Sequence, residues 1–275
     1  MAEKNMPKGY DILVVGCGGT GSAFLQSLIP YLVHRPQDAL PVSVTICDGD
    51  TVEEKNLARQ VFFPDQVGLN KALALAESIE GTFDYRVKVI SRYLEDFEEV
   101  NSCFHPNVKI PVLVGCVDNL KARAIYEEWF EKQKSAIYID CANEEFRGEV
   151  VYAAKFEGKL LSPLRSRVFP SVKQLLAEEV KSGKFRSEED CLARSLSGGA
   201  QHIFTNKMSA LLAANAVSVM LENNRPPLGM DIFSMRPILV VRHEDTSSLL
   251  PKMVHFETSE TKGKGKGKKR KREAG

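Results

Sequence analysis

A glycine-rich turn between a strand-like segment and a helix-like segment constrains this chain more than any other feature. Tyr10 to Gly16 (YDILVVG) is a largely apolar run of strand length, and the loop GCGGTG follows from Gly16 to Gly21. Ser22 to Val33 then places its apolar residues at helical spacing. Strand, tight turn and helix in this order are typical of the first unit of an open α/β sheet. The sequence therefore predicts such a unit at its start.

The same alternation repeats through the first half of the chain. We expect further strands at 42–48, 87–90, 112–116 and 136–141, and helices at about 70–80 and 120–132. Repeated alternation implies a mostly parallel sheet of the Rossmann-like α/β class, with helices on both faces.

The pattern changes after Asn143. Residues 148–156 alternate in the manner of an antiparallel strand, 203–221 form a strong helix, and 230–235 with 238–242 are expected to form a hairpin. The segment 165–199 is less regular and is interpreted as a lid or crossover. The predicted fold is thus a parallel α/β sheet extended by an antiparallel C-terminal part.

Charge is divided unevenly between the body of the chain and its end. The formal net charge is +1, but eight of the 37 basic residues lie between Lys262 and Arg272, so 29 basic residues face 36 acidic ones elsewhere. We expect the basic tail, 258–275, to be disordered, because it has no apolar surface to offset the entropy of ordering. A solvated tail, contact with nucleic acid and docking of an acidic partner all remain open for it.

Cysteine usage and the N-terminus indicate a soluble cytoplasmic protein. The six cysteines form no CxxC pair, which suits reduced thiols and predicts no structural zinc; they are Cys17, Cys47, Cys103, Cys116, Cys141 and Cys191. The N-terminus lacks the pattern of a signal peptide, and no apolar run approaches membrane-spanning length. The five histidines show no metal-ligand spacing.

Polar groups suited to a nucleotide follow the first two strands. The glycines Gly16, Gly18, Gly19 and Gly21 let the backbone approach phosphates, while helix N-terminal N–H groups stabilise negative charge. Asp48, 27 residues beyond Gly21, ends the second strand, where a carboxylate can accept hydrogen bonds from ribose hydroxyls. These features alone fit NAD, FAD, S-adenosylmethionine or ATP, and the alternative is a packing loop with a solvated acid.

A second set of polar residues favours ATP among these ligands. Arg59 and Lys71 would add fixed positive charge beside the glycine loop, which suits a triphosphate whose charge rises as pyrophosphate departs. Asn56 and Gln60 can donate hydrogen bonds without adding charge. An ordinary solvated surface is the alternative.

Asp118 and Asn119 follow the buried-looking segment VLVGCV. Mg²⁺ is typically held by one or two carboxylates and substrate phosphates, so Asp118, with Asp48 nearby, is a candidate Mg²⁺ ligand. The competing interpretation is that Asp118 caps the helix that begins near Leu120.

In order and approximate spacing, these clusters resemble the motifs of the ThiF/MoeB/HesA family of adenylating enzymes, bacterial relatives of the ubiquitin-activating enzymes. The resemblance rests on GCGGTG, Asp48-x-Asp50, Asn56-x-x-Arg59-Gln60, Lys71, and Asp118-Asn119 with Arg123. It covers residues 9–145, with weaker similarity through 200–221. A single adenylation domain is therefore expected over 1–257, with 9–145 as its nucleotide-binding half and 146–257 as its substrate-binding or crossover half.

The resemblance implies adenylation, by Mg-ATP, of the C-terminal carboxylate of a small ubiquitin-like protein of the β-grasp fold. By family role, Asp48 would hold the ribose and the glycine loop would face the phosphates. The phosphates would also contact Asn56, Arg59, Gln60 and Lys71, and Asp118 would hold Mg²⁺. The cofactor-binding set also includes Asp50 and Asn119.

Many relatives then transfer the activated carboxylate to a cysteine as a thioester, and Cys191 in EEDCLARSLSGG is the best-placed candidate. A thiol near the N-terminus of a short helix can have a lowered pKa, whereas Glu188, Glu189 and Asp190 disfavour an anion there. An inert thiol is the alternative.

The resemblance also bears on partners. It implies a homodimer, and it makes a conjugating enzyme a further candidate partner. Relatives often reach into the partner's ATP site with an N-terminal arginine, but only Lys4 and Lys8 precede Gly9 as cations here, so the source of such a cation stays open. Two rival functions are an NAD-dependent oxidoreductase, which would leave Arg59, Lys71 and Asp118 without a joint purpose, and a non-catalytic adenylation-fold scaffold.

Overall fold

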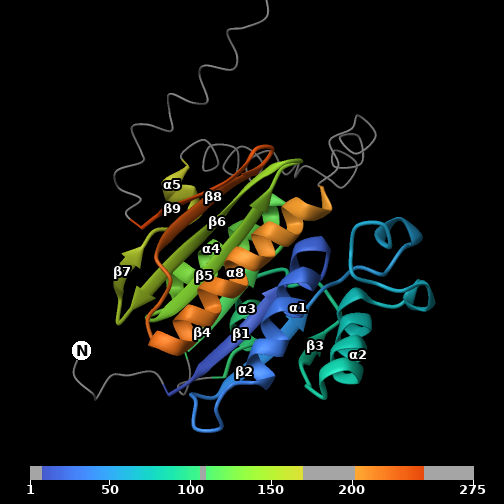
Figure 1. Cartoon of the computed structure of the whole chain (residues 1–275). Helices are drawn as coiled ribbons and strands as arrows, with labels where there is room; N and C mark the ends of the chain where they lie inside the picture. The colour runs from blue at the N-terminus through green and yellow to red at the C-terminus, as the bar shows by residue number, and fades with distance from the viewer. Residues whose placement is uncertain (1–7, 106–109, 170–201, 245–275) are drawn as a thin grey trace, which may run out of the picture.

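The first predicted strand is an interior strand of the sheet, which has nine strands in the described part of the chain (Figure 1). The structure is a computed structural model that describes residues 8–105, 110–169 and 202–244. The strands follow the order β3-β2-β1-β4-β5-β6-β8-β9, and β7 pairs with β6 outside this path. Cys191, the residues before Lys8 and the basic tail lie outside the described residues.

Five parallel strands make up the first half of the sheet. They are β1 (Tyr10–Val15), β2 (Val42–Cys47), β3 (Lys88–Ile90), β4 (Ile110–Gly115) and β5 (Ala136–Asn143). All six residues of β1 are buried, as a central strand covered on both faces requires. This confirms the parallel α/β class.

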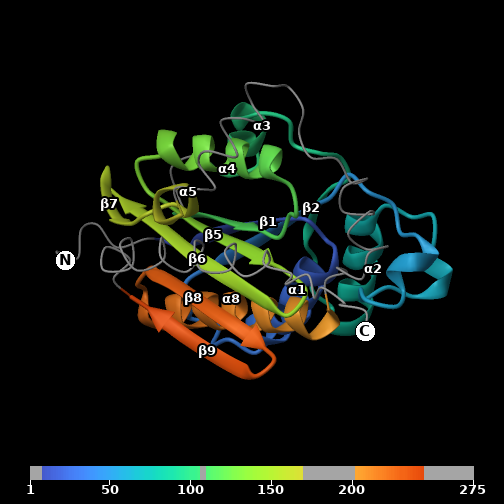
Figure 2. The same ribbon diagram turned by 90° about the horizontal axis from the view of Figure 1, so that it is seen from above.

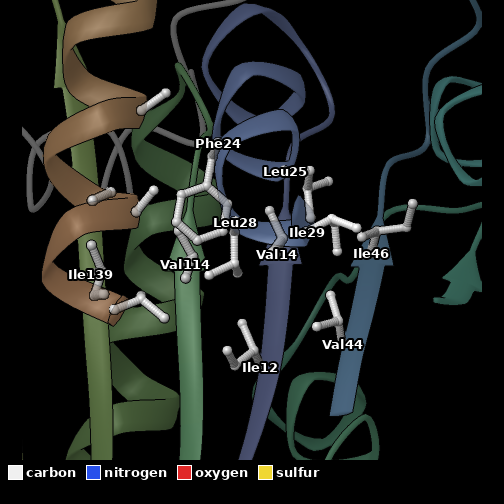
Figure 3. Close-up of a cluster of buried hydrophobic side chains, with 14 of the residues drawn as sticks. Ile12, Val14, Phe24, Leu25, Leu28, Ile29, Val44, Ile46, Val114 and Ile139 are labelled. Atoms are coloured by element: carbon white, nitrogen blue, oxygen red, sulfur yellow. The ribbon is translucent and has the colours of Figure 1, made fainter. Parts of the chain in front are cut away.

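Helices cover both faces of this half, as Figure 2 shows. The helices are α1 (Gly19–Val33), α2 (Lys71–Phe83), α3 (Phe97–Ser102) and α4 (Leu120–Lys132). Ile12 and Val14 of β1 pack in the cluster that contains α1 and α2, whereas Leu13 and Val15 pack in the cluster that contains α3 and α4. Figure 3 shows the first of these clusters, where Phe24 and Leu28 of α1 lie over the sheet.

The second half of the sheet is antiparallel, as expected. It contains β6 (Arg147–Phe156), β7 (Lys159–Ser162), β8 (Gly229–Met235) and β9 (Ile238–His243). The long helix α8 (Ile203–Asn223) lies beside α1 on the same face of the sheet (Figures 1 and 2) and contributes Ala210, Ala213 and Val217 to the core. The hairpin prediction is confirmed, with Arg236 and Pro237 between its strands.

Some element bounds differ from those predicted, and short elements were missed. Helix α1 begins at Gly19, because the glycine loop itself supplies the first turn of the helix. The missed elements are β7, α3, the short helix α5 (Arg165–Val168) and the single-turn 3-10 helices η2 (Glu54–Asn56) and η3 (Pro64–Gln66). Each is too short to show a hydrophobic period.

In the described part of the chain, no helix has the length and apolar character needed to cross a membrane.

Candidate nucleotide site

The carboxyl ends of three neighbouring strands bring the predicted site residues together. Gly16 follows β1, Asp48 follows β2, and Asp118 lies three residues beyond β4, with β1 paired in parallel to both neighbours. The chain moves outward from β1 to β2 and β3 on one side, and from β4 to β5 on the other. Open α/β sheets bind ligands at such a reversal of strand order.

The glycine loop has no room for side chains at its tightest points. Gly16 has a φ of +90°, and a Cβ added there would lie 2.6 Å from the carbonyl oxygen of Cys116. A Cβ at Gly21 would overlap the carbonyl oxygen of Gly16. Gly18 is the N-cap residue of α1 and Gly19 is its first residue, so the loop leads directly into the N-terminus of a 15-residue helix. This geometry suits a phosphate group.

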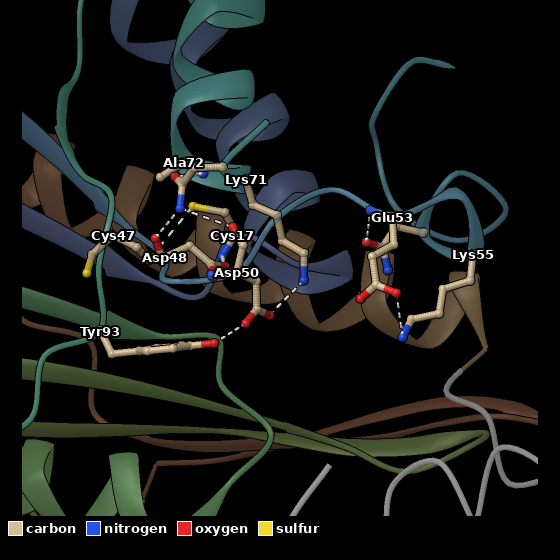
Figure 4. Close-up of polar contacts among 11 residues, drawn as sticks. Cys17, Cys47, Asp48, Asp50, Glu53, Lys55, Lys71, Ala72 and Tyr93 are labelled. Carbon is tan, nitrogen blue, oxygen red and sulfur yellow. Dashed lines mark hydrogen bonds and ion pairs between the residues drawn. The ribbon is translucent and has the colours of Figure 1, made fainter. Parts of the chain in front are cut away.

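Asp48 is fixed by main-chain amides. Its Oδ2 accepts a hydrogen bond from the N–H of Cys17 at 2.6 Å, and its Oδ1 accepts one from the N–H of Asp50 at 2.8 Å (Figure 4). Burial raises the pKa of the Asp48 carboxyl above 3.8, although these two hydrogen bonds act in the opposite direction. The carboxylate is therefore oriented beside the glycine loop, where each oxygen retains a lone pair for a further donor.

Lys71 and Asp50 form a mostly buried ion pair beside Asp48. The Nζ of Lys71, the first residue of α2, lies 2.8 Å from the Oδ2 of Asp50, and the hydroxyl of Tyr93 donates to the Oδ1 of Asp50 (Figure 4). Burial would raise the pKa of the Asp50 carboxyl, but the hydrogen bonds from Lys71 and Tyr93 outweigh it, so the pKa is lowered from 3.8. The predicted lysine is thus placed next to the predicted ribose carboxylate.

Asn70 joins this group to helix α2. Its Oδ1 accepts hydrogen bonds from the N–H groups of Ala72 and Leu73, so it caps α2, and its Nδ2 donates to the carbonyl oxygens of Asp48 (2.9 Å) and Asp50 (3.0 Å). Sequence reasoning missed Asn70 as a site residue. Its position at the very start of the predicted helix, 70–80, was the available signal, because asparagine is a favoured N-cap residue.

The segment Asn56 to Gln60 lies against the glycine loop. A Cβ added at Gly19 would lie 3.4 Å from the carbonyl oxygen of Arg59, and one added at Gly18 would lie 3.8 Å from the Nε2 of Gln60. The Oε1 of Gln60 is buried without a hydrogen-bond partner among the described residues. Asn56 is buried and uses its Oδ1 to accept the N–H of Glu53 at 2.9 Å, which leaves its amide N–H groups as the donors for a ligand.

Asp118 and Asn119 have different roles. The Oδ1 of Asn119 accepts the N–H of Ala122 at 2.8 Å, so Asn119 is the N-cap residue of α4. The alternative interpretation of Asp118 as the helix cap is therefore wrong. Asp118 is exposed, and its carboxylate makes no hydrogen bond or ion pair with the described residues, which suits a ligand for a cation brought in by a nucleotide.

Helix α8 supplies Asn206 to the site, a residue that sequence reasoning did not find. A Cβ at Gly19 would overlap the Nδ2 of Asn206, near the start of α8. The Oδ1 of Asn206 accepts a hydrogen bond from the Nδ2 of Asn143 at 3.1 Å, and Asn143 also donates to the hydroxyl of Thr20 at 2.9 Å. These contacts join segments that are far apart in the sequence, and no local pattern marks them.

Two thiols beside the site, those of Cys17 and Cys47, are poor nucleophiles. Burial raises the pKa of Cys17 well above 9.0, and burial raises that of Cys47 to about 12. Both thiols are therefore protonated at neutral pH, and a thiolate is the reactive form. The described residues also contain no group of three or more His, Cys, Asp or Glu side chains that could hold a metal ion.

The arrangement fits a nucleoside phosphate. A closely packed glycine turn at a helix N-terminus, an oriented carboxylate at the next strand end and a buried lysine beside it provide contacts for phosphate and ribose groups. Mg²⁺ bound through substrate phosphates needs only one or two protein carboxylates, and the exposed Asp118 can supply one.

The chain is similar in sequence to known activating enzymes. Ubiquitin-like modifier-activating enzyme 5 of Dictyostelium discoideum is 24% identical over 235 residues, which cover 79% of this chain and 56% of that protein. The enzyme of the same name from Oryza sativa subsp. japonica is 27% identical over 132 residues, covering 44% and 29% of the two chains. The chain thus spans about half or less of the length of these relatives.

Solved structures share the fold. A crystal structure of E. coli MccB with ATP superimposes with a TM-score of 0.58 at 17% identity, covering 86% of this chain and 64% of that one. A crystal structure of PaaA gives a TM-score of 0.56 at 16% identity, with the same coverage. The profile of the ThiF family matches residues 7–242. With this match across most of its length and a nucleotide-type site at the expected strand ends, the chain belongs to the ThiF family.

Proposed function

We propose that this protein uses Mg-ATP to adenylate the C-terminal carboxylate of a small ubiquitin-like protein. The observation that carries the proposal is the convergence of the glycine loop, the Asp48 carboxylate and Lys71 at adjoining strand ends. Family membership and the names of the relatives support the reaction class. Under this proposal, the terminal carboxylate attacks the α-phosphate of ATP, the bond to the β-phosphate breaks, and pyrophosphate leaves.

The residues act by binding and by electrostatics. Asp48 accepts hydrogen bonds from the ribose, and the N–H groups at the start of α1 face the phosphates. Lys71 and Arg59 stabilise the negative charge that develops on departing pyrophosphate, with Asn56 and Gln60 as neutral donors. Asp118 would hold Mg²⁺, which supplies charge neutralisation at the phosphates. No protein nucleophile is required for this step.

Thioester formation on Cys191 and homodimerisation remain proposals from the sequence. They are separate from adenylation, because a carboxylate can be activated before any thiol takes part. The NAD-dependent oxidoreductase is less well supported than adenylation, because it gives no joint role to Lys71 and Asp118. The scaffold alternative is disfavoured by the presence of Asp48, Lys71 and Asp118 together.

A direct test uses intact mass spectrometry. The protein is incubated with Mg-ATP and a candidate ubiquitin-like partner, and the partner is examined for a covalent AMP adduct. We expect the adduct with the free carboxyl terminus and none when that terminus is an amide. Adduct formation on the amidated partner, or its absence with every ubiquitin-like protein encoded near this one, would count against the proposal.

A further inference from the structure

Arg123 is a buried cation that the proposed reaction does not use directly. It lies in the first turn of α4, and its side chain is 10% exposed. A guanidinium removed from water in this way requires several hydrogen-bond partners. Its partners therefore show what the residue does.

The guanidinium of Arg123 bridges the ends of β4 and β5. Its Nη2 donates to the carbonyl oxygen of Val117 at 2.6 Å and to that of Cys141 at 2.9 Å, while its Nη1 pairs with the carboxylate of Asp140. Asp140 and Cys141 belong to β5, and Val117 lies just beyond β4. One side chain thus ties the segment after β4 to the neighbouring strand.

Asp118 lies between two fixed residues. The carbonyl of Val117 is held by Arg123, and Asn119 is held by its capping hydrogen bond to the N–H of Ala122. The same segment packs on the glycine loop, because a Cβ added at Gly16 would lie 2.6 Å from the carbonyl oxygen of Cys116 and 3.4 Å from the Cγ1 of Val117. The position of Asp118 relative to the phosphate-facing turn is therefore set by its neighbours.

Surrounding charges keep Arg123 in this structural role. Asp140 is 2% exposed, and Arg165 approaches its Oδ2 from the other side at 4.0 Å. Arg165 also pairs with Glu149. Two cations and two carboxylates thus balance within the cluster, and the three hydrogen bonds of the Arg123 guanidinium go to acceptors of β5 and of the segment after β4.

We infer that Arg123 is a positioning residue that places Asp118 for its interaction with Mg²⁺ at the proposed nucleotide site. The inference rests on the proposed function and adds a residue that acts through the main chain. Partners that orient metal ligands from outside the coordination shell typically change metal affinity by about 10- to 100-fold when they are replaced.

The test compares Arg123→Lys with Arg165→Lys. A lysine at position 123 keeps the charge opposite Asp140 but cannot reproduce the planar set of donors to two carbonyls. Arg165 is the matched control, because its side chain is 11% exposed and it shares Asp140, yet none of its hydrogen bonds or ion pairs involves Val117. Arg123→Gln is a second variant for use if Arg123→Lys does not fold.

Two binding measurements that require no turnover separate positioning from stability. Mn²⁺ affinity is measured by electron paramagnetic resonance in the presence of ATP, and ATP affinity is measured in EDTA. We expect Arg123→Lys to weaken Mn²⁺ binding by about 10-fold, with unchanged ATP affinity in EDTA. Arg165→Lys should leave Mn²⁺ binding as in the wild type, even where both variants lower the melting temperature.

The possible outcomes are distinct. Equal Mn²⁺ affinity in wild type and in the folded Arg123 variants, or an equal loss in Arg123→Lys and Arg165→Lys, would overturn the positioning role. Asp118→Asn serves as the reference: if it binds Mn²⁺ as the wild type does, the proposed metal ligand itself is wrong. If Asp118→Asn loses Mn²⁺ and the Arg123 variants do not, only the inference on Arg123 fails.

Discussion

Lys71 begins helix α2 with its ammonium 2.8 Å from the Oδ2 of Asp50, and only 7% of the residue is exposed. A cation at this position is disfavoured by the helix dipole, whose N-terminal end is positive. The Asp50 carboxylate compensates for that cost within the protein. A lysine kept there beside the glycine loop is well placed to meet the phosphates of a nucleotide.

Replacing Lys71 should impair adenylation far more than folding. We expect Lys71→Met to lower the rate of pyrophosphate exchange by about 100-fold or more, because it removes a charge that would stabilise departing pyrophosphate. The free energy of unfolding should fall by about 1 to 2 kcal/mol, since Asp50 is partly exposed and keeps the Tyr93 hydroxyl as a donor. Chemical denaturation and an exchange assay measure the two effects.

Lys55→Met is the matched control for this lysine. Lys55 pairs with Glu53 at 2.9 Å, but both side chains are more than half exposed. Its loss should leave stability and exchange close to wild type. An equal loss of exchange in both variants would show that the effect of Lys71 is only one of general surface charge.

The Lys71–Asp50 pair should also give stability a specific pH dependence. The Asp50 carboxyl has a pKa below 3.8 in the folded protein, where burial is outweighed by the hydrogen bonds from Lys71 and Tyr93. The stabilisation from this carboxylate is therefore present above the unfolded-state pKa and is lost as the pH falls through the folded-state pKa. Urea denaturation should show a difference between wild type and Lys71→Met that is larger at about pH 6 than at about pH 3. A difference that grows on acidification would contradict the assignment.

The effect of a glycine-to-alanine substitution on stability should depend on the free space around that glycine. Gly21→Ala should strongly destabilise the fold, because its Cβ would overlap the carbonyl oxygen of Gly16. Gly81 lies in α2, and a Cβ there would meet no atom within 4 Å. Gly81→Ala should therefore stabilise the protein by about 0.5 to 1 kcal/mol. Thermal and denaturant unfolding of both variants check the prediction, and a stable, ATP-binding Gly21→Ala protein would contradict the loop geometry.

Asp118 and Cys191 should affect different steps. Asp118→Asn should remove pyrophosphate exchange without loss of stability, because Asp118 is exposed and its carboxylate makes no hydrogen bond or ion pair with the described residues. The exposed Asp38, in the connection between α1 and β2, provides the control Asp38→Asn, which should exchange normally.

The variant Cys191→Ala should retain pyrophosphate exchange and lose any reducible covalent conjugate with the partner. Loss of exchange in a folded Cys191→Ala protein would overturn this division of roles.

Much of the fold could be predicted from the sequence, because its elements carry strong local patterns. The buried strand before Gly16 and the long helix α8 each have an unbroken residue pattern, from which strand and helix can be told apart. Short elements such as α3 and β7 lack such a period. Their formation depends on packing against distant segments.

Site residues at strand ends could be predicted from the sequence. Site residues that depend on contacts between distant segments could not. Asp48 and Lys71 could be selected from the sequence because Asp48 ends a predicted strand and Lys71 lies at the start of a predicted helix, and the structure brings both side chains close to Asp50. Tyr93 and Asn206 were missed, since their contacts with Asp50 and the glycine loop arise only after the chain has folded. Asn119, rather than Asp118, caps α4, a difference of one residue that helix patterns do not resolve.

The most direct test of the account is exchange of labelled pyrophosphate into ATP, driven by a ubiquitin-like protein. The reverse of adenylation restores ATP from the adenylate and pyrophosphate, so label enters ATP only if that intermediate forms. We predict exchange that requires Mg²⁺ and the partner's free terminal carboxylate, and that is lost in Asp118→Asn. Exchange of equal rate with a C-terminally amidated partner, or formation of ADP and phosphate in place of AMP and pyrophosphate, would contradict the proposed reaction.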